Sequence, residues 1–128
     1  MSDADDPRAY LKKILAERGY VLDYHKALAA EDLEFFKTLN ALIDLAYKRQ
    51  RLLDQKTKEM AFIAALVGLA AGKEHIKIHM NAAKRAGASK EEVLELLEML
   101  VCPCGVPKFM MGYDAWAECF EVNRVEPG

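Results

Sequence analysis

The stretch from Met60 to Ala71, with Gly68 counted in it, is apolar on every side, and it constrains the fold more than any other segment. Its polar first turn follows Asp54, a residue type that caps helix N-termini. A helix that is apolar all round belongs in the interior of a protein. The stretch has about twelve residues, whereas a membrane-spanning helix needs about 20. The sequence therefore predicts a buried central helix.

Helical signals recur on both sides of this segment. Apolar residues follow the 3.6-residue period, and glycine and proline fall between the periodic runs. No run of five residues alternates with period two, so strands are not expected. The other expected helices run from Pro7, capped by Asp6, to Gly19; from Glu31 to Ala46; from Glu74 to Ala86, before Gly87; from the Ser89 and Glu92 capping box to Pro103; and from Pro107 to Phe120. We expect an all-α bundle of about six helices.

The size and charge of the chain narrow its class. Its 128 residues, 52% hydrophobic and 30% charged, suit one core, so one domain over residues 1–128 is expected. The net charge is -2 and the basic residues are scattered among acidic ones, which disfavours a nucleic-acid or membrane partner. Met1 to Pro7 contains no basic region followed by an apolar run, so we expect a cytoplasmic protein.

Two histidines form the candidate site. His75 and His79 are four residues apart, so on a helix they point the same way, about 6 Å apart along the axis. Gly72 precedes them and allows a tight turn. A lone histidine on such a face is more often a hydrogen-bonded core residue. The pair, with Glu74 beside it and Glu59 one helix earlier, favours a functional pocket.

Metal and thiol chemistry are weaker alternatives. A helical zinc site of the metalloprotease type has its glutamate after the first histidine and a third ligand elsewhere, and neither is evident, so no metal is expected. Cys102 and Cys104 flank Pro103 and could form a strained redox disulfide. The negative end of a helix disfavours a thiolate there, so buried structural cysteines are expected.

An ordered series of residues extends beyond the histidines. It reads Leu53-Asp54-x-x-Thr57-Lys58-Glu59, Gly72-Lys73-Glu74-His75-x-x-x-His79, Ala83, Ala86-Gly87-Ala88-Ser89-x-Glu91-Glu92 and Gly105-Val106-Pro107. The series resembles the carboxymuconolactone decarboxylase family, most strongly over residues 52–117. The resemblance implies an AhpD-like helical bundle that assembles as a homo-oligomer, a trimer or hexamer, with a pocket near a subunit interface.

The resemblance also implies an activity. The alkylhydroperoxidase AhpD-like relatives carry two motif cysteines, which would fall at Gly72 and His75, so the thiol relay has no atoms here. The implied reaction is cofactor-independent decarboxylation of a small organic acid or lactone of the γ-carboxymuconolactone type. His79 would be the acid/base and His75 would bind the oxyanion or orient the substrate. Glu74 or Glu59 would fix the histidine tautomer.

Several features stay open at this point. Lys73 or Lys108 would supply a cation for the anionic substrate. Neither a metal nor a cofactor is expected. Two other functions compete with the decarboxylase, an AhpD-like thiol oxidoreductase and a non-catalytic helical oligomer, because membership of a superfamily does not determine chemistry.

Overall fold

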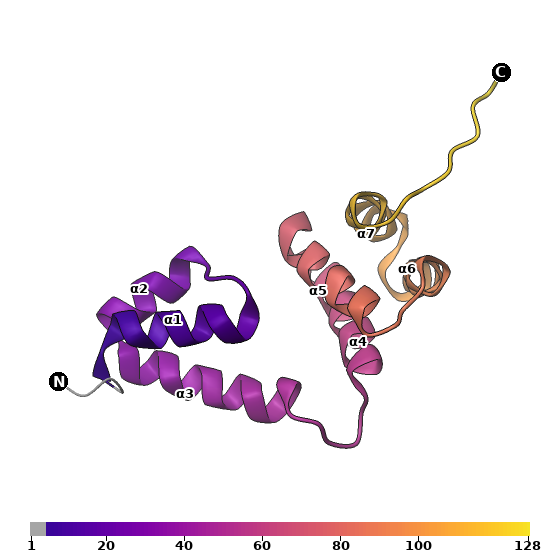
Figure 1. Ribbon diagram of the computed structural model, residues 1–128. Helices are drawn as coiled ribbons and strands as arrows, with labels where there is room; N and C mark the ends of the chain where they lie inside the picture. Colours follow the sequence, from indigo (N-terminus) through magenta and orange to yellow (C-terminus); the bar gives the residue numbers. More distant parts are fainter. Residues whose placement is uncertain (1–4) are drawn as a thin grey trace. The chain divides into compact units, whose positions relative to one another are not determined.

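The computed structural model describes residues 5–128, so part of the N-terminal stretch Met1 to Pro7 lies outside it. Over that range the chain has seven α-helices and no strand, which confirms the all-α class (Figure 1). The chain forms two compact units that divide after Arg49. No helix in residues 5–128 is long and apolar enough to cross a membrane. The single domain expected over residues 1–128 stays a prediction.

Three helices make the N-terminal unit. They are α1 (Pro7–Arg18), α2 (Asp23–Glu31) and α3 (Leu33–Ile43), followed by a π-helical turn η2 (Asp44–Lys48). Each helix contributes one buried residue to a small core, which consists of Ile14, Ala29 and Phe36. As expected, Asp6 caps α1, because its side chain accepts a hydrogen bond from the Arg8 backbone N–H at 3.0 Å.

Helix α2 was not expected, and it raises the count from about six helices to seven. Its N-cap is Leu22, a residue type without a capping side chain. His25, the third residue of the helix, bonds back to this N-cap, because its Nδ1 accepts a hydrogen bond from the Leu22 backbone N–H at 3.0 Å. The expected start of the next helix at Glu31 is also wrong, since Asp32 caps α3 by accepting from the Phe35 N–H.

Four helices make the C-terminal unit. They are α4 (Gln55–Gly68), α5 (Lys73–Arg85), α6 (Lys90–Cys104) and α7 (Val106–Cys119). Helix α4 packs against the other three, which confirms its central place in this unit. Its expected burial on every side is wrong, because Ala61 and Ala65 are exposed and Leu69, just past the end of the helix, is 77% exposed. Fully buried side chains come from all four helices and include Ile63, Val67, Ile76, Met80, Ala83, Val93, Leu97 and Ala115.

The expected caps of this unit are confirmed. The Asp54 carboxylate accepts a hydrogen bond from the Thr57 N–H at 2.8 Å and starts α4. Ser89 and Glu92 form the capping box of α6, with hydrogen bonds of 3.0 and 2.9 Å. Gly87, two residues after the end of α5, has the left-handed conformation, at φ 100°. These local signals determine where α4, α5 and α6 begin or end.

Two expected chain breaks are wrong in detail. Pro103 lies inside α6, and the break comes at Gly105, whose φ of 84° requires a residue without a side chain. The last helix therefore begins at Val106. The tight turn between α4 and α5 uses Ala70, at φ 57°, while Gly72 has ordinary extended geometry at the N-cap of α5.

Close packing of α7 generates a testable prediction at Gly112. A Cβ atom there would lie 2.6 Å from Leu97 Cδ2 and 3.3 Å from Val67 Cγ2, and both side chains are fully buried. Overpacking costs about 1 to 3 kcal/mol, which exceeds the helix-propensity gain of about 0.5 to 1 kcal/mol. Chemical denaturation of Gly112→Ala should therefore show a lower free energy of unfolding than the parent.

Gly68→Ala is the matched control for this prediction. A Cβ atom at Gly68 would meet only Cys104 Sγ, at an ordinary contact distance of 3.8 Å. Removing a helical glycine without a clash should leave stability unchanged or raise it by up to about 1 kcal/mol. A Gly112→Ala variant as stable as the parent would show that α7 does not depend on this close approach.

Candidate active site

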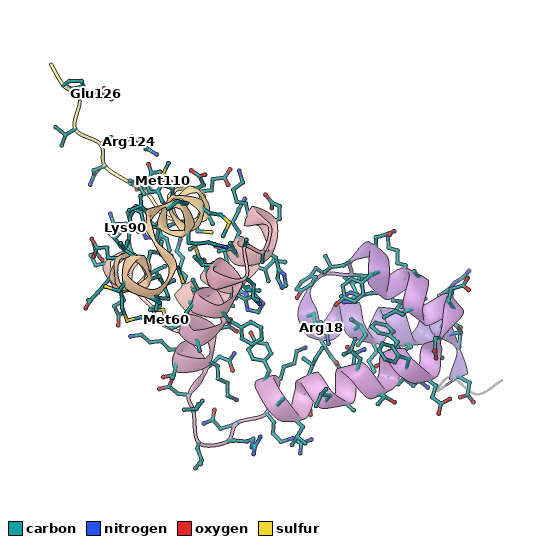
Figure 2. All side chains as sticks on the ribbon, turned by 180° about the vertical axis from the view of Figure 1, so that it is seen from behind. Arg18, Met60, Lys90, Met110, Arg124 and Glu126 are labelled. Carbon is teal, nitrogen blue, oxygen red and sulfur yellow. The ribbon has the colours of Figure 1, made fainter. Side chains whose placement is uncertain are left out.

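Three side chains lie along one face of α4. Gln55, Glu59 and Phe62 are separated by four and three residues, the spacing that stacks side chains along one side of a helix. The Gln55 Nε2 donates a hydrogen bond to Glu59 Oε1 at 2.9 Å. Met60, the next residue after Glu59, is labelled on α4 in Figure 2. The carboxylate of Glu59 is thus held by its own helix.

Helix α5 brings His79 to this carboxylate. The His79 Nδ1 lies 2.8 Å from Glu59 Oε2, and both side chains are buried, Glu59 with only 1% of its surface exposed. Glu59 therefore has a hydrogen-bonding partner on each oxygen. A buried carboxylate needs such partners, because an isolated charge in the interior is costly.

The contact with Glu59 determines which nitrogen of the neutral His79 ring carries the proton. An ionised carboxylate only accepts hydrogen bonds, so Nδ1 of His79 carries the proton and donates it to Glu59. In the neutral ring the lone pair is then on Nε2, the nitrogen that accepts or returns a proton in acid–base chemistry. This is the arrangement by which a carboxylate orients a catalytic histidine.

Two rings flank His79. Phe62 stacks on it with ring centroids 4.2 Å apart and planes inclined by 10°. His75 lies one turn before His79 in α5, and the centroids of the two imidazole rings are 5.4 Å apart. The Phe62 stack limits rotation of the imidazole about its bond to the chain, and His75 places a second imidazole within reach of a small ligand at His79.

The His75 ring has a different environment from that of His79. His75 is exposed, although partial desolvation of its ring lowers its pKa below the ordinary value. The nearby His79 lowers the His75 pKa further, because two like charges repel. His75 is therefore mainly neutral near pH 7, and a neutral imidazole still offers one N–H donor.

The other predicted residues lie elsewhere. Glu74 is directed to solvent, with 81% of its side chain exposed and Lys77 Nζ 3.6 Å away, and among residues 5–128 it has no hydrogen bond to either histidine. Lys73 pairs with Glu118 at 3.1 Å, which raises the Lys73 pKa. Lys108 donates to the Gly68 carbonyl at 3.3 Å. A catalytic role for Glu74 stays a prediction.

The three cysteines are not joined in a disulfide. All three are free thiols. Cys102 and Cys104 are two residues apart in α6, where successive side chains rotate by about 100°, so their side chains diverge by about 200°. Cys102 is exposed and Cys104 is only half-buried against the core, so the expected burial is wrong for Cys102 and partial for Cys104. Burial raises the pKa of the Cys119 thiol.

The structure adds Gln55 and Phe62, which the sequence patterns did not single out. Gln55 lies one helical turn before Glu59, so the spacing of four residues is a usable signal for this hydrogen bond. Nothing local identifies Phe62, because an aromatic residue in an apolar helix is most simply a core residue. Among the described side chains, no three of the types His, Cys, Asp or Glu are grouped as metal ligands would be.

Comparison with known proteins gives one result. The sequence profile of the carboxymuconolactone decarboxylase family matches residues 34–118, about two thirds of the chain. The matched range includes Glu59, His75 and His79. A search of curated proteins found none that matches the chain.

The two-histidine arrangement predicts how His75 titrates. Its pKa in the parent should be below the ordinary value of about 6.5, and it should rise in His79→Gln, because the charge of His79 contributes to the shift. NMR titration of the imidazole protons measures this directly. His25 is an internal control, since burial and Arg18 lower its pKa. A His75 pKa that is identical in the parent and the variant would contradict the proximity of the two rings.

Proposed function

Because the chain belongs to the carboxymuconolactone decarboxylase family, we propose that it decarboxylates a small organic acid or lactone of the γ-carboxymuconolactone type without a cofactor. The observation that supports this proposal is the buried hydrogen bond of 2.8 Å between Glu59 and His79. This hydrogen bond orients a histidine within the residues that match the family, and an oriented histidine can act as an acid or base. Substrate binding, turnover and the roles below belong to the proposal.

The reaction makes two demands on the protein. Loss of CO2 breaks a carbon–carbon bond and leaves the electron pair in a dienolate, whose oxygen carries negative charge. The dienolate then takes a proton at carbon. A site for this reaction must therefore donate hydrogen bonds to the oxygen and deliver one proton.

His79 is the proposed proton donor. With Nδ1–H bound to Glu59, protonated His79 carries its second proton on Nε2 and transfers it from there to carbon, leaving a neutral ring. The Glu59 carboxylate keeps the ring in this orientation. Gln55 positions Glu59 through the hydrogen bond to Oε1.

His75 is the proposed oxyanion donor. Its lowered pKa leaves the ring neutral near pH 7, so it can donate a hydrogen bond to the dienolate oxygen without competing as an acid. Its exposed position on α5 gives a ligand access to it. We keep Glu74, one residue earlier, as a second candidate for orienting the substrate from the solvent side.

The competing functions receive less support. Gly72 and His75 occupy the positions of the AhpD-like motif cysteines, and Cys102 and Cys104 diverge in α6. A thiol oxidoreductase would need two thiols that can meet. A non-catalytic helical oligomer would not need an ordered hydrogen-bond chain from Gln55 through Glu59 to a histidine, although a structural role for that chain is the alternative that the variants below test.

We also propose that the protein acts as a homo-oligomer. Large apolar side chains stay exposed in both units, including Leu42 of α3 at 61%, Leu69 just after α4 at 77% and Met110 of α7 at 59%. Single exposed apolar side chains are common on monomers, so the family match supports this proposal, and these residues are candidates for the subunit contacts. The remaining partner would be the small-molecule acid itself, with no nucleic acid or membrane.

Substitutions in the dyad test the proposed chemistry. His79→Gln should reduce turnover of γ-carboxymuconolactone by about 10²- to 10⁴-fold, because the amide cannot transfer the proton. Glu59→Gln should reduce it by about 10²-fold or more, because an amide can donate to Nδ1 and select the wrong tautomer. Glu95→Gln, which removes an exposed carboxylate from α6, is the control and should retain full activity.

Thermal unfolding of the same variants separates chemistry from structure. A purely structural dyad predicts a loss of about 1 to 3 kcal/mol in unfolding free energy with unchanged turnover per folded molecule. That outcome would remove the catalytic role. A parent protein that is inactive on this lactone would instead remove the substrate assignment.

Light scattering tests the oligomer. The mass in solution should be a multiple of the monomer mass of 14.4 kDa at micromolar concentration, and a trimer or hexamer is the expected assembly. A monodisperse monomer over the concentration range used for activity would contradict this proposal.

A further inference from the structure

A second candidate site lies in the N-terminal unit. A cavity of about 870 Å³ opens between α1 and α3, and all its lining residues belong to these helices and to η2. This volume is within the range of about 300 to 1,000 Å³ that small-molecule sites occupy. The His79 site does not involve any of these residues.

Long polar side chains bridge α1 and α3 across this cavity. Arg18 Nη2 donates a hydrogen bond of 2.6 Å to Asn40 Oδ1, and Asn40 Nδ2 donates one of 2.9 Å to the Tyr10 hydroxyl. Asn40 is buried, so both of its polar atoms need these partners. The bridge orders the Arg18 guanidinium at the cavity wall, at the C-terminal end of α1, where Figure 2 labels it.

Arg18 is a half-buried cation with unused hydrogen-bonding capacity. Among residues 5–128 no carboxylate lies within ion-pair distance of it, and its Nε is buried without an acceptor. A guanidinium is always charged and presents five N–H donors. Burying such a group without an anion is costly, and native proteins rarely do so without a functional reason.

His25 is a second buried donor in this unit. Its Nδ1 accepts the hydrogen bond from Leu22, so its Nε2 carries the proton, and Nε2 is buried without an acceptor among the described residues. Burial lowers the His25 pKa, and the Arg18 charge lowers it further. His25 does not line the cavity, so Arg18 is the donor that faces it.

The cavity lining has more positive than negative charge. Lys13, Arg18, Lys37 and Lys48 are opposed there only by Glu17 and Asp44. Asp44 is already paired with Arg49 at 3.0 Å. Partial desolvation and the Arg18 charge lower the Lys48 pKa more than Glu17 and Asp44 raise it, so the two cations destabilise each other. An anion between Arg18 and Lys48 would relieve this repulsion.

We propose that the cavity between α1 and α3 binds a small organic carboxylate, with the Arg18 guanidinium as its main partner and Lys48 as the second cation. The remaining wall is apolar, formed by Ala9, Ile14 and Ala41, so the ligand has a hydrocarbon body rather than being an inorganic anion. Arginine suits this role because its fork matches a carboxylate with two parallel hydrogen bonds.

Adipate is a suitable probe, with adipamide as the neutral molecule of the same length. NMR of the full-length protein should show a saturable shift of the Arg18 Nε–Hε signal with adipate and no shift with adipamide. Arg18→Gln should weaken adipate binding by about tenfold or more, which corresponds to the loss of a charge-assisted hydrogen bond. Circular dichroism verifies that this variant is folded.

Two further variants keep the test decisive if Arg18→Gln unfolds. Lys48→Gln changes an exposed residue at the edge of the cavity and should weaken adipate binding several-fold. Lys12→Gln removes the same charge from the exposed side of α1, outside the lining, and should leave the affinity unchanged. Equal weakening by both variants would show only general charge attraction and would overturn the proposal.

Other outcomes would also overturn it. Saturable binding of inorganic phosphate but not adipate would exclude the organic carboxylate. The absence of saturable binding by either anion would exclude the site. If the Arg18 signal shifts as the protein concentration rises, and adipate no longer binds at high protein concentration, the cavity is occupied by a second copy of the chain.

Discussion

The C-terminal unit is organised around a carboxylate that it buries. An ionised side chain in a protein interior is stable only when hydrogen-bond donors replace the water it has lost. Gln55 and His79 supply those donors to the two oxygens of Glu59, one from the same helix and one from the next. This requires α4 and α5 to pack in one register. The turn at Ala70 and the fully buried contacts of Ile63 and Met80 stabilise that register.

The hydrogen bond between Glu59 and His79 also determines which nitrogen of the His79 ring is left without a proton. By accepting the hydrogen bond from Nδ1–H, Glu59 leaves the lone pair of the neutral His79 ring on Nε2, and Phe62 stacks against the ring. Within residues 5–128 no carboxylate is paired with His75, and desolvation and the nearby His79 lower the His75 pKa. Two histidines of one helix therefore have different environments, which is how one site can separate proton transfer from hydrogen-bond donation.

The sequence predicted well what local signals decide. Asp54 and Ser89 cap helices because their side chains bond to the backbone within three residues, and the 3.6-residue period identified the buried Ile76, Met80 and Ala83. Helix α2 was not predicted because its N-cap residue, Leu22, has no capping side chain, and the histidine that bonds back to it, His25, is not a usual cap residue. The choice between Glu59 and Glu74 depends on how α4 packs on α5, and the bridge from Arg18 to Asn40 joins residues 22 apart. Neither the packing of α4 on α5 nor this long-range hydrogen bond produces a pattern in the local sequence.

The most direct test of the account is the tautomer of His79, which ¹⁵N NMR of the imidazole nitrogens reports. With the ring neutral, the account predicts that Nδ1 is protonated and Nε2 is not, and that Glu59→Gln weakens or reverses this preference while His25 keeps its proton on Nε2. A His79 ring protonated on Nε2 in the parent, with no change in Glu59→Gln, would contradict the central claim that the Glu59 carboxylate orients His79.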